Sequence, residues 1–241
     1  MKLKKYFVLG IAGAAFAAFG LFTGCKTHAD ENYIYTAQME IDRLDTDGDE
    51  TIDAYKYVVA IEVSESIPSL VVAFPGGTQH DTTCEEDEGD IECFTSTFNI
   101  ATDELQIGTG EYRIIIDSEV VHSFTVEASH LDNALFPKYA VSVTPATSEV
   151  VLNPQTFDWD TSVDGVNGDG WEGYLLNENN DNRNYTDSLN WTTTQVVLDH
   201  PALTGSGDNM SINIASFIGY NRSGYYQAYW SVVTISGYTA D

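Results

Sequence analysis

Apolar and polar residues alternate with a period of two along most of the chain after residue 33, and this pattern most restricts its fold. Short segments rich in Val, Ile, Tyr, Phe and Thr are separated by clusters of Asp, Gly, Asn and Pro, as in strands joined by turns. No segment shows an amphipathic helical pattern longer than about two turns. The sequence therefore predicts an all-β fold.

The expected strands fall into two sets. The first set covers residues 34–43, 55–63, 69–74, 94–100, 111–117 and 121–127, and its last two members form a hairpin across Ser118 and Glu119. The second set covers residues 139–144, 155–160, 171–178, 193–199, 210–217 and 225–236. Strand spacing of this kind is typical of antiparallel sandwiches. We predict two antiparallel β-sandwich domains, residues 33–130 and 139–241, joined by a linker over 131–138.

Both halves resemble the immunoglobulin-like and fibronectin-type modules of bacterial surface lipoproteins. In the first half, Gly108-Thr-Gly-Glu-Tyr112 resembles the entry to the penultimate strand of such modules. In the second half, residues 154–159 resemble an early strand with a core Trp, and the strand around Trp230 resembles a closing strand. The resemblance implies immunoglobulin-like domains. The inter-sheet disulfide of antibody domains is absent, and a jelly roll remains an alternative topology.

The N-terminal segment has the features of a secretory signal. Three lysines lie within residues 1–5, an apolar run extends from Tyr6 to Phe22, and small residues precede Cys25. Residues 21–25, Leu-Phe-Thr-Gly-Cys, resemble a bacterial lipobox, which implies a signal peptide over 1–24, an acylated Cys25 and a tether over 25–32. The expected location is the outer membrane or cell surface, with the periplasmic or external face left open. An uncleaved transmembrane helix is the alternative.

The other two cysteines of the chain are Cys84 and Cys93. An even number of cysteines in an exported chain indicates a disulfide, and we predict that these two are bonded. The bond would close a short acidic loop and stabilise the fold by roughly 3 kcal/mol through chain entropy. The sequence has no Cys-x-x-Cys pair for a zinc or redox site.

The chain has 10 Lys and Arg against 37 Asp and Glu, a formal net charge of -27. This balance argues against nucleic-acid binding, which needs clustered basic residues to replace counterions. The hydrophobic share of 43% is too high for a disordered acidic tail. We expect a folded, acidic protein.

Carboxylates recur at alternate positions of the segment that begins at Asp45. With Asp47, Asp49 and Asp53 it resembles the aspartate-rich calcium loops of EF-hands and thrombospondin type 3 repeats. Glu50 replaces the usual glycine, and Lys56 replaces the bidentate Glu of an EF-hand. The four expected calcium ligands are Asp45, Asp47, Asp49 and Asp53. The alternative is a polar hairpin tip that turns at Asp47 and Gly48.

All four tryptophans lie in the second predicted domain. We expect Trp159 and Trp230 to fill its core. Trp171 and Trp191 lie beside loops rich in Gly and Asn, and we expect them to contact a ligand. Exposed aromatic rings in a β-sandwich would suit a carbohydrate.

The sequence does not contain the motifs of common hydrolase sites, such as Gly-x-Ser-x-Gly or His-Glu-x-x-His. We therefore expect a non-catalytic lipoprotein, attached to the membrane through acylated Cys25, that acts as a surface adhesion, scaffold or assembly module. Its partner is an unidentified protein or glycan, and we expect no nucleic-acid partner. The alternative function is carbohydrate binding through the second domain, with a possible dependence on calcium.

Overall fold

The computed structural model describes residues 34–64, 67, 69–87, 90–100, 105–146, 150–151, 154–177, 183–198 and 209–240. The described chain is almost entirely β, which confirms the all-β class. Its helical elements are two short 3-10 helices, η1 (Ala128–Leu131) and η2 (Asn133–Leu135). No helix in these ranges has the length and hydrophobicity needed to cross a membrane.

The strands of the first half end before the 3-10 helices. They are β1 (Ile34–Asp45), β2 (Ala54–Val63), β3 (Val71–Ala73), β4 (Gln79–Asp87), β5 (Asp90–Thr95), β6 (Phe98–Ile100), β7 (Gly110–Ile116) and β8 (Glu119–Val126). The strands of the second half follow the helices. They are β9 (Ala140–Thr144), β10 (Val150–Val151), β11 (Gln155–Thr161), β12 (Gly170–Asn177), β13 (Arg183–Asn190), β14 (Gln195–Leu198), β15 (Asn209–Arg222) and β16 (Tyr225–Ala240).

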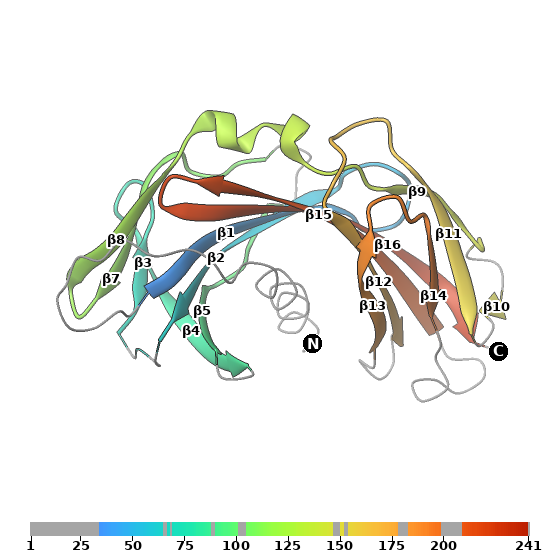
Figure 1. Ribbon diagram of the computed structural model, residues 1–241, viewed down its shortest axis with the longest axis horizontal. Coiled ribbons are helices and arrows are strands. Elements are labelled where there is room, and N and C mark those ends of the chain that lie inside the picture. The colour runs from blue at the N-terminus through green and yellow to red at the C-terminus, as the bar shows by residue number, and fades with distance from the viewer. Residues whose placement is uncertain are drawn as a thin grey trace.

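One large sheet runs through both halves of the chain. Its order is β13-β12-β15-β16-β1-β2-β5-β4-β3-β7-β8, and a second sheet has the order β14-β11-β9. The large sheet bends into an arch (Figure 1). At its centre β1 pairs with β16 in parallel, from Gln38 opposite Tyr226 to Asp45 opposite Val233. The two predicted sandwiches are thus joined through their first and last strands, and a separate two-domain, immunoglobulin-like arrangement is not confirmed.

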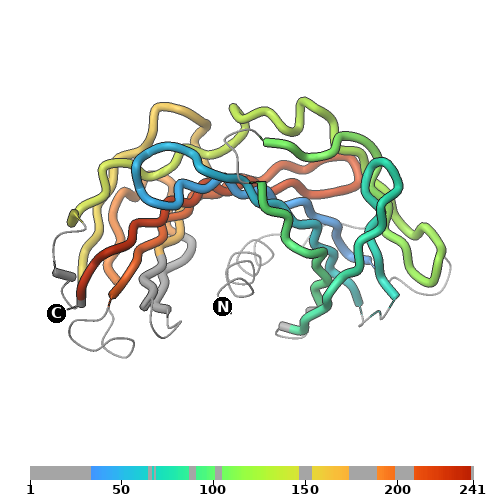
Figure 2. Tube along the Cα trace, turned by 180° about the vertical axis from the view of Figure 1, so that it is seen from behind, coloured from blue at the N-terminus to red at the C-terminus, as the bar shows by residue number. Residues whose placement is uncertain are grey.

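The outer, convex face of the large sheet carries the two main cores. In the first half, Met39 and Ile41 of β1 belong to a buried cluster with Tyr112 and Phe124 of β7 and β8. In the second half a buried cluster joins β12, β15 and β16 to the small sheet, and its members are Ala140, Phe157, Trp159, Trp171, Val196, Leu198, Met210, Ile212, Ile214, Val233 and Tyr238. Figure 2 shows both outer layers from behind. Trp159 is buried in this second-half core, as expected, whereas Trp230 is buried in a separate cluster with Leu44, Ala215, Ala228 and Val232.

The segment predicted as a linker over 131–138 is packed onto the sheet, together with η1. The buried Arg43 guanidinium donates to the Pro137 carbonyl at 2.5 Å and to Ser231 Oγ at 2.7 Å. Ser231 Oγ also donates to Pro137 O, at 2.7 Å. Further along, the Gln227 amide donates to His130 O at 3.0 Å, and the Tyr229 hydroxyl donates to the same oxygen. These bonds to β1 and β16 make the segment part of the fold.

The predicted disulfide is confirmed: Cys84 and Cys93 are bonded and lie directly opposite each other on β4 and β5. The segment between them was expected to be an acidic loop, but strand pairing continues to Asp87 opposite Asp90. The sequence pattern missed β4 because acidic residues disfavour strands locally, whereas the cross-strand bond and pairing with β2 hold the hairpin. β10 and β13 were also missed.

The turn between β7 and β8 places two non-glycine residues in left-handed backbone. Asp117 has φ of 50° and Ser118 has φ of 72°, as a two-residue hairpin turn requires. Asn and Gly tolerate these angles better. We predict that the double variant Asp117→Asn, Ser118→Gly raises the free energy of unfolding by about 1 kcal/mol, measured by urea denaturation. The Asp117→Asn change would keep the side-chain oxygen that accepts from Ser69 Oγ at 2.5 Å. An unchanged or lower stability would contradict the strain assigned to this turn.

Candidate functional site

The aspartate-rich loop connects β1 to β2, as its alternative interpretation as a hairpin tip requires. Asp45 ends β1, is buried, and accepts backbone N–H bonds from Gly48 at 2.6 Å and Glu50 at 2.9 Å. Burial raises the pKa of Asp45, and these bonds oppose the rise because they favour the ionised carboxylate. Asp45 therefore organises the loop around its own side chain.

Three of the four expected calcium ligands come together. One carboxylate oxygen each of Asp45, Asp47 and Asp49 lies within 4.8 Å of the others. Asp53 is not in this group: its Oδ2 accepts from the backbone N of Thr46 at 2.7 Å and from its hydroxyl at 2.6 Å. The Thr46 bonds lower the pKa of Asp53. The geometry brings together a three-carboxylate group and gives Asp53 a role in closing the loop.

Glu50 follows this group and has φ of 69°, so it adopts the left-handed conformation that glycine usually supplies at this point. Its Oε1 accepts from the backbone N of Ser142 at 3.0 Å, and the Tyr139 hydroxyl donates to its carbonyl at 3.1 Å. Ser142, on β9, also has positive φ, 53°. The loop is thereby attached to the edge strand of the small sheet, and Glu50 satisfies an edge N–H of β9.

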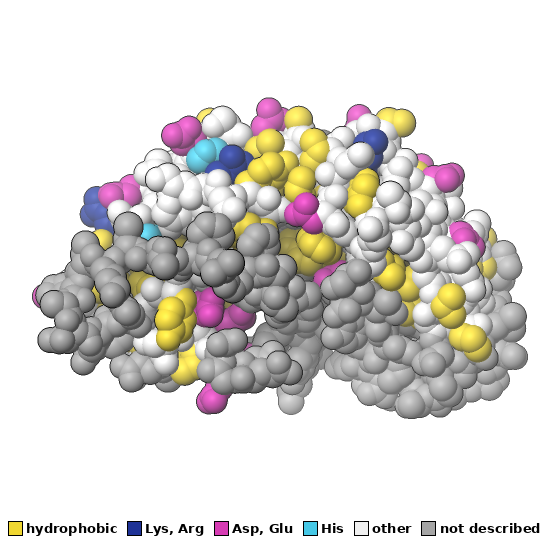
Figure 3. Space-filling view, in the orientation of Figure 1, with side chains coloured by type: hydrophobic (Ala, Val, Ile, Leu, Met, Phe, Trp, Pro, Cys, Tyr) yellow, Lys and Arg dark blue, Asp and Glu magenta, His cyan; other side chains and the backbone are white. Residues whose placement is uncertain are grey.

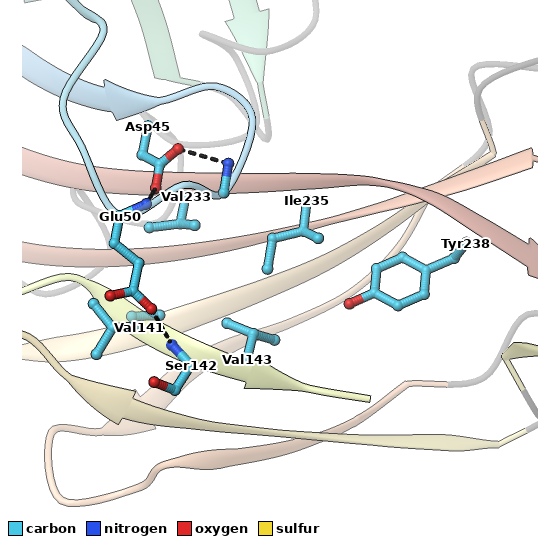
Figure 4. A pocket seen from close by; sticks show the side chains of 10 residues that line it. Asp45, Glu50, Val141, Ser142, Val143, Val233, Ile235 and Tyr238 are labelled. Carbon is cyan, nitrogen blue, oxygen red and sulfur yellow. Dashed lines mark hydrogen bonds between the residues drawn. The ribbon is translucent and has the colours of Figure 1, made fainter. Parts of the chain in front are cut away.

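A pocket of about 190 Å³ opens beside this attachment (Figure 4). Carboxylates of Asp45 and Glu50 lie at one end, and Val233, Ile235 and Tyr238 form much of its apolar wall. Gly48 approaches this wall so closely that a Cβ would meet Ile235 Cγ1 at 2.9 Å. The loop conformation and the pocket wall therefore depend on each other.

The structure places Trp171 and Trp191 in contact, with ring centroids 4.9 Å apart and planes 7° from parallel. Trp171 is 0% exposed, and its Nε1 donates to the Trp191 carbonyl at 3.0 Å. Its ring also packs on Trp159 at 5.4 Å. The ring of Trp171 packs against Trp159 and Trp191 and its N–H is already bonded within the protein, so the expectation that it contacts a ligand does not fit its position. Trp191 is half-buried, with one ring face against Trp171.

A cluster of acidic side chains that the sequence did not indicate lies on the inner face of the large sheet, opposite the two main cores. Glu40 and Asp42 of β1 are buried there, with Glu172 of β12. Burial, followed by the charges of Asp42, Glu172 and Glu92, raises the pKa of Glu40 well above its ordinary value. Burial also raises the pKa of Asp42 to about 7, and Lys56 opposes this shift.

The sequence feature that could have indicated this cluster is the set of polar residues at every second position of β1. They alternate with Met39 and Ile41, a pattern that normally indicates a solvated strand face. Only the structure shows that the polar side is buried as well.

Cys25 and the rest of the predicted signal peptide and tether lie outside the described residues. No known protein-family model matches the chain, and no curated protein matches it in sequence.

Proposed function

We propose that this protein is a non-catalytic lipoprotein, anchored through acylated Cys25 at the outer membrane or cell surface, that binds a partner protein as an adhesion, scaffold or assembly module. The observation that carries the proposal is the continuous arch built from both halves of the chain. The segment between the two halves, residues 131–138, is hydrogen-bonded to β1 and β16. This inter-half segment therefore suits a rigid platform that presents a surface to a partner. The lipobox resemblance of residues 21–25 supports the anchor.

Electrostatics also favour a protein partner. Acidic side chains are spread over the surface in Figure 3, where basic ones are few, in keeping with a net charge of -27. A surface of one sign speeds association with an oppositely charged partner and discourages others. The acidic surface therefore favours a partner protein that carries basic residues.

The anchor is tested by Cys25→Ser. In bacteria that process lipoproteins, we expect the native chain in the membrane fraction with incorporated labelled palmitate. The variant should carry no label. Stable attachment needs two or more acyl groups, which Cys25 would carry. Equal palmitate labelling of the native protein and the Cys25→Ser variant would contradict the anchor. Cys84→Ser with Cys93→Ser is the matched cysteine control and should remain labelled.

Carbohydrate binding is the second candidate, and the half-exposed Trp191 is the observation in its favour. A glycan array probed with the soluble chain from residue 26 separates the two functions. We expect no glycan to bind and Trp fluorescence to stay unchanged. Binding that is lost in Trp191→Ala would replace the protein-binding proposal with the carbohydrate one.

We also propose calcium binding by Asp45, Asp47 and Asp49, on the support of their convergent oxygens. At a calcium concentration 100-fold above Kd, binding would stabilise the fold by about 2.7 kcal/mol. For a chain of this size the melting temperature should rise by about 5–10 °C relative to chelator. Asp47→Asn with Asp49→Asn should abolish the rise, and Glu119→Gln with Asp160→Asn, which removes equal charge elsewhere, should retain it. Equal melting in calcium and chelator would mean that the loop is only a turn.

A further inference from the structure

The inner face of the large sheet carries a second acidic surface, distinct from the aspartate-rich loop. Because Met39 and Ile41 enter the outer core, alternation along β1 directs Gln38, Glu40 and Asp42 to the inner face. Residues paired across neighbouring strands share a face. The same side therefore includes Glu62, Glu85, Glu92, Glu172 and Lys56. Among the side chains described on this face, Lys56 is the one basic group.

Buried polar atoms without a hydrogen-bond partner gather on this face. The described residues contain six such side-chain atoms, and five of them lie here: Gln38 Nε2, Glu40 Oε2, Asp42 Oδ1, Asn213 Oδ1 and Trp230 Nε1. Burying a polar atom without a partner is costly, so native proteins rarely do so without a reason. Their concentration on three adjacent strands, β1, β15 and β16, points to a ligand that supplies the missing bonds.

The arrangement does not suit a single metal ion. In the described chain, the only group of three or more ligating residues with oxygens within 4.8 Å of one another is Asp45, Asp47 and Asp49. Glu40 and Asp42 are two positions apart on a strand, a spacing of about 6.8 Å along the backbone. An extended ligand with hydrogen-bond donors at that repeat would fit them. A polypeptide strand places alternate side chains at the same repeat.

We propose that this inner face binds an extended basic segment of a partner protein, whose Lys or Arg side chains meet Glu40, Asp42 and Glu172. The proposal rests on the proposed function and names the chemistry of the partner. Phe217 and Tyr226, which pack against the buried Trp230 on this face, offer partly exposed rings for cation–π contact. Phe217 and Tyr226 are only partly buried, as are Lys56 and Glu92, so solvent reaches the side chains that flank the buried Glu40, Asp42 and Glu172.

Binding of such a segment is linked to proton release. Burial, followed by the charges of Asp42, Glu172 and Glu92, raises the pKa of Glu40, against a hydrogen bond with Gln38. Burial also raises the pKa of Asp42, against the charge of Lys56, so both carboxyls favour the protonated form in the free protein. A bound ammonium or guanidinium group favours the ionised form. Protons therefore leave when the partner binds near neutral pH, and affinity falls as the pH decreases from 8 to 5.

The test is calorimetric titration of the chain from residue 26 with an alternating Lys-Ser decapeptide at pH 7. We expect Glu40→Gln with Asp42→Asn to weaken binding at least 10-fold. The matched variant, Glu119→Gln with Asp160→Asn, replaces the same two types of carboxyl group at exposed positions on the outer layers and should change affinity less than 2-fold. Titration in two buffers of different ionisation heat should show proton release in the native chain and little in the inner-face variant.

Alternating Glu-Ser peptide, spermine and chitohexaose are the ligand controls, and circular dichroism checks that each variant is folded. Equal weakening in both variants would reduce the effect to general attraction by net charge and overturn the site. Tighter binding of spermine or chitohexaose than of the Lys-Ser peptide would also overturn it. Membrane anchoring is read separately through Cys25, so failure of the inner-face site is distinguishable from failure of the anchored-lipoprotein proposal.

Discussion

Asp42→Asn should stabilise this protein at pH 8 and have almost no effect near pH 3.5. Burial raises the pKa of Asp42 from 3.8 to about 7. A group with a raised pKa in the folded state destabilises the fold as pH increases through this interval, because the unfolded chain loses its proton first. At about 1.4 kcal/mol per pH unit, the gain on removing this titration is up to about 4 kcal/mol at pH 8.

Urea denaturation at pH 3.5, 6 and 8 measures this effect. Asn keeps the size of the side chain and cannot ionise, so the difference between variant and native chain should grow with pH and level off above 7. Asp160→Asn, on the exposed side of β11, should show no such growth. A variant that is less stable than the native chain at pH 8 would show that the Asp42 charge is compensated in the fold. Stabilisation by removing an ionisable group fits a surface kept for binding rather than for stability.

Arg43→Ala should destabilise the fold by about 3 kcal/mol. Its guanidinium donates to Pro137 O and Ser231 Oγ, and its Cζ lies 5.3 Å from the Phe136 ring and 5.0 Å from the Tyr139 ring. A hydrogen bond from a charged donor contributes about 1.5–3 kcal/mol, and burial leaves no water to replace it. Arg43 therefore holds the inter-half segment against β1 and β16.

Hydrogen exchange of residues 128–138 is the second measurement, since these amides should exchange faster in Arg43→Ala. Arg43→Lys keeps the charge but not the planar fork, and most of the loss should remain. The exposed Arg113, whose ion pair with Glu111 spans 2.5 Å, is the control. Arg113→Ala should cost less than about 1 kcal/mol, as is usual for surface pairs. Equal costs for the two alanine variants would refute the role assigned to Arg43.

Local patterns were sufficient where a strand has one apolar face and a turn has its own residue chemistry. Strands β1, β2, β7 and β8 lie where alternation predicted them, and the β7 to β8 turn lies at Asp117 and Ser118, one residue from the expected position. The even number of cysteines that remain besides Cys25 also indicated the Cys84 and Cys93 bond. Each of these features depends on interactions within a few tens of residues.

Pairings between distant segments could not be predicted in the same way. The parallel pair of β1 and β16 joins residues almost 190 positions apart, such as Arg43 and Ser231. No local pattern indicates which strand will occupy an open sheet edge. The expected division into two sandwiches did not anticipate this pair, and a packed segment was predicted as a linker for the same reason.

By itself, the sequence determined an all-β chain, the positions of most strands and turns, the disulfide and a strongly acidic surface, because these follow from local periodicity, residue chemistry and charge. Only the tertiary structure decided that the two halves share one arch, that Trp171 is buried against Trp191, and that Glu40 and Asp42 are buried on its inner face. The physical reason is that burial depends on which distant strands lie beside and above a residue, and a polar residue at every second position looks the same in sequence whether that face meets water or not.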